Sequence, residues 1–166
     1  MKLRPHWILT GLLVLLLLSA CSGPSGPSLN FSPDFISTNV GQSFTMALRA
    51  ENVSDLTAFQ VHLGFDPDML EVVFIESGGF LEPDFIVQNA FDNAAGTLDY
   101  AAAQLGRPAV QGSGDLLKIS FRARASGTAT IDFRFTPAAP DGALLADIDG
   151  RSIPVLLGKV TVRISP

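Results

Sequence analysis

The residues that this chain lacks limit what it can do. Of its 166 residues one is a cysteine, Cys21, so the chain cannot close a disulfide within itself. It has one tyrosine, Tyr100, and two histidines, His6 and His62. Past the N-terminal segment, His62 has neither a second histidine nor a thiol with which to complete a nucleophile–base pair. We interpret the chain as a protein without enzyme activity, in which His62 is a surface residue of a strand.

Basic side chains are scarce in the first half of the chain. From residue 30 to residue 106 the only basic residue is Arg49, against eleven acidic ones, whereas from residue 107 onward eight basic residues stand against five acidic ones. Lys2 and Arg4 are the only charges before residue 21, so the remainder carries 9 − 16 = −7. Such an acidic chain does not bind a phosphate backbone non-specifically, which excludes nucleic acid as a partner. The acidic half is either a set of solvated strand faces or a patch that steers a basic partner.

The acidic residues do not form a pattern typical of catalysis or metal binding. Glycoside hydrolysis needs two carboxylates placed across a cleft, which flat sheet faces seldom offer. Asp147, Asp149 and Gly150 fit the start of a calcium loop, but the third acidic ligand and the distant glutamate are missing. A hairpin turn is predicted there instead, and we expect no catalytic residue, no metal site and no cofactor.

The N-terminus carries the pattern of an export signal. Lys2 and Arg4 precede the apolar run WILTGLLVLLLLSA, which as a helix spans roughly 21 Å against the roughly 30 Å of bilayer hydrocarbon. A basic start, a short apolar core and small residues before Cys21 are typical of a signal peptide. The stretch Leu18-Ser-Ala-Cys21 resembles a bacterial lipobox. This resemblance implies that the Cys21 thiol carries a diacylglycerol.

Three segments are therefore predicted. Residues 1–20 form a cleaved lipoprotein signal peptide, residues 21–30 hold the lipidated Cys21 and a Gly/Pro/Ser linker, and residues 31–166 form one folded domain. The linker stretch SGPSGPS spans on the order of 25 Å when extended, which keeps the domain near its membrane. Because two or three acyl chains give stable anchorage, we expect an exported bacterial lipoprotein anchored to the cell membrane or cell surface.

Apolar residues from about residue 31 onward repeat every two positions. In 117–124, for example, Leu117, Ile119 and Phe121 point one way and polar side chains the other. Glycine-containing turn signals recur between such runs, and no long helical pattern is present in the sequence. Clean alternation with frequent turns predicts an all-β protein, a β-sandwich. The inward positions include Phe44, Met46, Leu48, Phe59, Val61, Leu63, Phe65, Ile131, Phe133 and Phe135.

The stretch FQVHLGFDPDMLEVV interrupts one strand and starts the next. Pro67 disfavours the helical region at Asp66 and itself suits the first position of a helical turn. The Asp66 carboxylate can then accept a hydrogen bond from the amide of Asp68 or Met69. We predict a corner between two sheets, with Met69 or Leu70 closing that end of the sandwich.

Several short motifs, taken in order, are similar to those of cohesin domains, the receptor modules of cellulosomes. The resemblance covers almost all of 31–166, and the Asp-Pro-x-x-Leu corner is its most specific part. It implies a nine-stranded jelly-roll sandwich without a catalytic site, which binds dockerins through one flat sheet face. Dockerins are small calcium-loaded helical modules attached to enzymes or structural proteins. The matching motifs are Val40-Gly-Gln-Ser-Phe44, Asn52-Val53, Phe65-Asp-Pro-Asp-Met-Leu-Glu-Val-Val73, Gly78-Gly-Phe-Leu81, Gly114-Asp-Leu-Leu-Lys-Ile-Ser-Phe121, Gly127 and Gly158-Lys-Val-Thr-Val162.

The resemblance places the binding face on strands near 56–65, 83–90, 97–105 and 128–136. By alternation the strand 98–103 exposes either Asp99, Ala101 and Ala103 or the opposite set, and we favour the arrangement with Leu98, Tyr100 and Ala102 inward. Phe80, Phe85 and Phe91 are candidates for the rim of this face, although core packing is expected for at least two of them, and Phe85 is the one retained as a candidate binding residue. The candidate partner-binding residues are Ala58, Gln60, His62, Gly64, Phe85, Asp99, Ala101 and Ala103.

Small outward residues form a smooth surface on which a helix can lie closely, although such residues also occur on sheet faces that have no binding role. Cohesins that bind the commonest dockerins often carry Asn and Asp where Ala58 and Gln60 stand, so this chain need not bind those dockerins. A carbohydrate-binding module is the main alternative, because its fold is similar. Trp7 lies in the signal and Tyr100 points inward, which weakens that alternative. A structural envelope lipoprotein is a second alternative.

Overall fold

The computed structural model describes residues 26–166, and the predicted signal peptide and Cys21 lie outside these residues. The described chain is all β, with no helix long and apolar enough to cross a membrane. Its strands are β1 (Ser28–Ser32), β2 (Phe35–Asn39), β3 (Ser43–Gly64), β4 (Leu70–Ser77), β5 (Phe85–Asp92), β6 (Thr97–Ala103), β7 (Val110–Ala123), β8 (Gly127–Phe133), β9 (Ala143–Asp147), β10 (Leu156–Leu157) and β11 (Val160–Ser165).

The sandwich begins slightly earlier than the sequence indicates. Ser28, Leu29 and Asn30 were expected in the linker but belong to β1, which pairs with β3. Leu29 is fully buried, so it supplies the apolar contact that ties this segment down. The described residues form eleven strands, where nine were expected.

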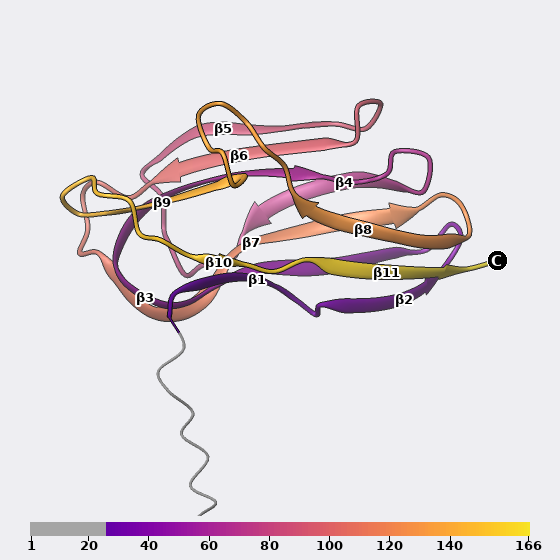
Figure 1. The fold of residues 1–166 in the computed structure, drawn as a ribbon, viewed down its shortest axis with the longest axis horizontal. Helices are drawn as coiled ribbons and strands as arrows, with labels where there is room; N and C mark the ends of the chain where they lie inside the picture. The colour runs from indigo at the N-terminus through magenta and orange to yellow at the C-terminus, as the bar shows by residue number, and fades with distance from the viewer. Residues whose placement is uncertain (1–25) are drawn as a thin grey trace, which may run out of the picture.

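The long strand β3 belongs to both layers of the sandwich. It bends where its register with β7 shifts twice, between Ala50 and Leu56. Asn52 and Asp55 have positive φ values of 52° and 55°, a left-handed conformation that asparagine and aspartate tolerate better than most residues. Figure 1 shows β3 sweeping round one end of the molecule and returning. Residues 43–50 therefore lie in one layer and residues 56–64 in the other.

The two layers follow from this bend. The front layer is ordered β5–β6–β3–β9, with β3 contributing 56–64. The back layer is ordered β4–β7–β3–β1–β10, with β3 contributing 43–50. A further ladder, β2–β11–β8, joins the front layer where β8 pairs with the end of β3. This is the expected jelly-roll sandwich.

The core between the layers is apolar and well packed. Phe121 of β7 is fully buried, stacks on Phe44 at 5.8 Å between ring centroids and meets Phe65 edge-on at 5.5 Å. Phe31 of β1 contacts Phe133 of β8 at 5.5 Å. These contacts join residues that are far apart in the sequence. Most of the inward positions were predicted from the alternation of apolar residues.

Phe135 departs from the predicted core, and fewer of Phe80, Phe85 and Phe91 are buried than expected. Phe135 is 67% exposed, because β8 ends at Phe133 and the chain then leaves the sheet. Phe85 is 58% exposed and Phe91 is 43% exposed. Both lie on β5, an edge strand that pairs only with β6. Of Phe80, Phe85 and Phe91, only Phe80 packs against the core, so the expectation of at least two was wrong.

The corner at Asp66 forms as predicted. The Asp66 carboxylate accepts from the Asp68 amide at 2.9 Å, and the Asp66 carbonyl accepts from the amides of Met69 and Leu70. Leu70 is fully buried and begins β4 in the back layer. The turn at Asp147 also forms, since its carboxylate accepts from the amides of Asp149 and Arg151.

Replacing Phe121 with alanine should lower the free energy of unfolding by about 3–5 kcal/mol, because it leaves a cavity where the two layers meet. Urea denaturation measures this, with Phe135→Ala as the matched control, expected within about 0.5 kcal/mol of the parent. Equal losses in the two variants would contradict the assignment of the core.

Candidate functional site

The outward side of the front layer carries small residues at the centre of its first two rows, and we call it the small-residue face. The register of β5, β6, β3 and β9 arranges its side chains in rows that cross the strands. The first row is Phe85, Ala103, Ala58 and Ala146; the second is Gln88, Ala101, Gln60 and Leu144; the third is Ala90, Asp99 and His62; the fourth is Asp92, Thr97, Gly64 and Asp132.

The structure brings together all eight candidate residues that the sequence suggested. Ala58, Gln60, His62 and Gly64 come from β3, Asp99, Ala101 and Ala103 from β6, and Phe85 from β5. Reasoning from the sequence missed the β9 contribution, Leu144 and Ala146, although the alternation within Ala143–Asp147 carries the signal. It also missed Gln88 and Ala90, because a register shift between Ile86 and Gln88 changes which β5 residues point outward.

A shallow apolar hollow of about 150 Å³ lies across the first two rows. Its floor consists of alanines from three strands, including Ala58, Ala101 and Ala146. Val87 and Leu144, which are both exposed, line it as well. The hollow exists because the central residues carry no side-chain atom beyond Cβ. It can accept an apolar side chain from a partner.

A chain of polar contacts occupies the other half of the face. Gln60 Nε2 lies 2.7 Å from His62 Nε2, and His62 Nδ1 lies 2.5 Å from Asp99 Oδ1. Arg134, just after β8, donates from Nη2 to the same Asp99 oxygen at 2.6 Å. His62 is only 6% exposed, so the expectation that it is a surface residue was wrong. It is instead a buried, hydrogen-bonded link between Gln60 and Asp99.

The backbone holds this polar chain in place. The His62 amide donates to the Gly142 carbonyl, and the Arg134 amide donates to the His62 carbonyl, both at 2.8 Å. Within the described residues, Arg134 Nε is the one buried side-chain nitrogen or oxygen without a hydrogen-bond partner. His62 is therefore fixed from both sides, by its ring and by its backbone.

Two groups near the face show shifted titration. Hydrogen bonds from the amides of Ala95 and Ala94 hold the pKa of the Asp92 carboxyl below its ordinary value, which keeps the fourth row negatively charged. Burial raises the pKa of the Tyr100 phenol. Tyr100 is 3% exposed and stacks on Phe59 beneath the face, as predicted.

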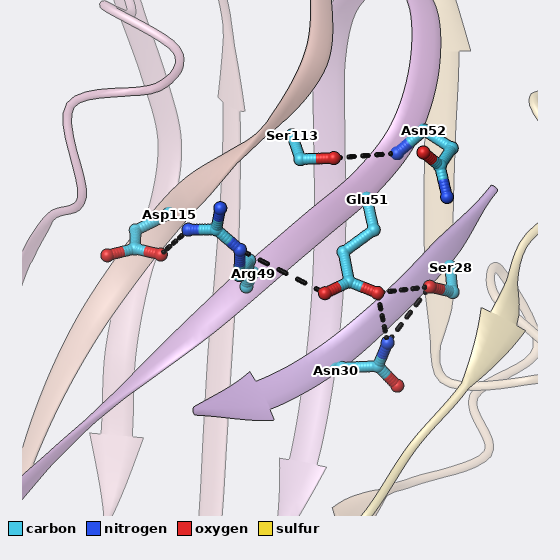
Figure 2. Close-up of polar contacts among 7 residues, drawn as sticks. All are labelled: Ser28, Asn30, Arg49, Glu51, Asn52, Ser113 and Asp115. Atoms are coloured by element: carbon cyan, nitrogen blue, oxygen red, sulfur yellow. Dashed lines mark hydrogen bonds and ion pairs between the residues drawn. The ribbon is translucent and has the colours of Figure 1, made fainter. Parts of the chain in front are cut away.

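The back face of the sandwich is different in character. Figure 2 shows its outward polar side chains bonded to one another: Arg49 pairs with Asp115 at 2.8 Å, and Glu51 accepts from Ser28 and Asn30. These groups already satisfy much of their hydrogen-bonding capacity, and covering them would remove charged groups from water. Covering the apolar half of the small-residue face does not remove charged groups from water.

The small-residue face offers a surface for binding. Its one histidine is enclosed between Gln60 and Asp99. In the part of the chain that the structure describes, no three His, Cys, Asp or Glu side chains are grouped so as to hold a metal ion. A partner can approach the Ala-rich rows closely, and this is what the geometry offers.

Comparison with known proteins agrees with the architecture. A family model described as the cohesin domain matches residues 29–149. A type II cohesin domain from the cellulosome of Acetivibrio cellulolyticus has a TM-score of 0.72 at 21% identity, covering 83% of this chain and 95% of that one. A non-cellulosomal cohesin from Archaeoglobus fulgidus gives 0.67 at 16% identity, covering 86% and 93%.

A third similar structure is a type I cohesin–dockerin complex from Clostridium thermocellum, with a TM-score of 0.71 at 14% identity, covering 85% of this chain and 100% of that one. The search of curated proteins gave no match. At these identities the solved structures support the fold alone, whereas the family model spans most of the described sandwich. The chain therefore belongs to the cohesin domain family.

Proposed function

We propose that this cohesin-family chain is a non-catalytic module that captures a protein partner, a dockerin-bearing protein, on the small-residue face. The contrast between the two faces carries the proposal. One face is smooth and hollowed over its apolar half, while the other is charged and internally paired. The similar structures include complexes of a cohesin with a dockerin, which supports a helical partner of that kind.

The face fits a helix for a simple steric reason. Side chains that end at Cβ, such as Ala58, Ala101 and Ala103, let a partner backbone approach closely. An apolar side chain of the partner would fill the hollow, and exposed Phe85 and Leu144 would pack beside it. Affinity would then come from apolar burial surrounded by polar groups. The excess of acidic residues in the first half of the chain would speed encounter with a basic partner.

Carbohydrate binding has less support. Sugar rings usually stack on exposed tryptophan or tyrosine, and Tyr100 is buried beneath the face. A structural envelope role would instead require the sandwich to pair with itself or a neighbour. The capture experiment described below distinguishes each of these alternatives from a dockerin-binding module.

We further propose that the domain acts at a membrane. The lipobox-like stretch before Cys21 and the short Gly/Pro/Ser segment after it support this. A lipid on Cys21 would hold the sandwich within a few nanometres of the bilayer, since the linker is short. The module would then collect dockerin-bearing proteins at the cell surface.

Replacing Ala58 or Ala101 with arginine should weaken partner capture at least thirtyfold, or by about 2 kcal/mol, because the long side chain fills the hollow. Isothermal titration measures the affinity, and circular dichroism checks the fold. Ala47→Arg is the matched control, because Ala47 lies outward on the back layer, between Ser32 and Lys118 in register. Unchanged affinity in both front variants, or an equal loss in Ala47→Arg, would show that the partner does not bind at the small-residue face.

Capture from the secretome of the source organism should return a protein with dockerin-like calcium repeats, and a calcium chelator should abolish the capture. Mass spectrometry identifies the retained protein. Thermal unfolding of the chain alone, with and without chelator, separates an effect on the partner from one on this chain. Retention by insoluble polysaccharide alone would favour a carbohydrate-binding module, and recovery of this chain alone would favour a structural role.

Replacing Cys21 with alanine should move the protein from the membrane fraction to the soluble fraction, because the acyl chains would have no attachment site. Cell fractionation and immunoblotting measure this, with Ser22→Ala as the control. Full membrane retention of the Cys21 variant would contradict the proposed anchor.

A further inference from the structure

We propose that Gln60 determines which partners this face accepts, because His62 fixes its amide with the carbonyl oxygen toward the partner. The inference rests on the proposed function and refines it. The face would present one fixed hydrogen-bond acceptor beside the apolar hollow. It would select a partner that places a donor there, preferably the cationic end of a lysine or arginine.

The orientation follows from the contacts of His62, starting at Asp99. Asp99 Oδ1 accepts a hydrogen bond from Arg134 Nη2 at 2.6 Å, and a carboxylate oxygen that carries no proton can only accept. The His62 Nδ1 atom, at 2.5 Å from the same oxygen, must therefore carry a proton. In a neutral ring the other nitrogen, Nε2, then has a free lone pair and can only accept.

Gln60 is the other hydrogen-bond partner of the His62 ring. Its Nε2 lies 2.7 Å from His62 Nε2, so the amide group donates and the ring accepts. This leaves Gln60 Oε1 as the free end of the amide. The oxygen makes no hydrogen bond within the described residues and is not among their buried unsatisfied atoms, so it is not fully buried. Gln60 is also one of the residues that line the hollow.

The surrounding charges favour a cationic donor. The fourth row of the face ends in Asp92 on β5 and Asp132 on β8, both exposed. Arg134, next to the face, is engaged by Asp99. A lysine or arginine near Gln60 would therefore meet an accepting oxygen in an acidic surrounding, whereas an acidic side chain there would find no donor and a repulsive field.

Gln88 provides an internal control. It occupies the same row as Gln60, across Ala101, and points outward from β5. No side-chain hydrogen bond ties Gln88 down within the described part of the chain, so its amide is free to turn. Any effect that depends on the His62 contact should therefore appear at Gln60 and not at Gln88.

The first test needs no partner. Long-range ¹H–¹⁵N correlation spectra of the ¹⁵N-labelled full-length chain at pH 7.5 should show His62 protonated at Nδ1 and unprotonated at Nε2. In His62→Ala, which removes the ring, the Gln60 side-chain amide signals should shift, while those of Gln88 stay in place. An Nε2–H tautomer at pH 7.5, or Gln60 signals that do not change in His62→Ala, would overturn the proposal.

The second test measures selection with a calcium-loaded dockerin module from the same organism. At pH 7.5 Gln60→Leu should lose roughly tenfold to a hundredfold in affinity, because it removes a hydrogen bond to a charged group. Gln60→Glu, which keeps an outward acceptor, should retain affinity, and Gln88→Leu should stay within about twofold.

The two tests separate the possible failures. If no dockerin module binds while the spectra show the expected tautomer, the proposed function fails and the choice of partner fails with it. If a module binds but Gln60→Leu and Gln88→Leu behave alike, the function stands and the selective role of Gln60 is wrong.

Discussion

The bend in β3 is the constraint on which the other features of this sandwich depend. One strand of 22 residues turns at Asn52 and Asp55, so its first part joins the back layer and its second part the front layer. Its inward residues then meet across one core, which Phe65 and Phe121 help to close. The outward residues of the two parts point to opposite sides of the molecule. The two faces of the protein thus differ because the two halves of one strand differ in their outward residues.

Polar groups serve different purposes on the two faces: on the back they bond to one another, and on the front one is left for a partner. On the back, Arg49, Glu51 and Asp115 pair with their neighbours and leave little to offer a partner. On the front, the Ala-rich rows cost little to cover, and the polar chain ending at Gln60 leaves one acceptor free. Apolar burial would supply affinity there, and the single fixed acceptor would supply discrimination, because an unmatched polar group in an interface is penalised.

Much of this could be predicted from the sequence, since alternation gives both the fold class and the facing of each strand. The Asp66 corner was readable because Pro67 restricts the backbone by local sterics. The sequence alone could not predict exposure or burial where these depend on where a strand ends or on contacts with distant parts of the chain. Phe135 alternates correctly but lies past the end of β8. In the sequence, His62 has the position of a surface residue. In the fold its ring bonds to Asp99, which is 37 residues further along the chain, and Asp99 in turn bonds to Arg134, a further 35 residues along.

Amide hydrogen exchange with and without a bound dockerin module tests most directly whether the small-residue face is the binding surface. The account predicts slower exchange in β6 and in residues 56–64 of β3 on complex formation, with residues 43–50 of the same strand unchanged. Protection confined to residues 43–50 and β1, on the charged back layer, would contradict it.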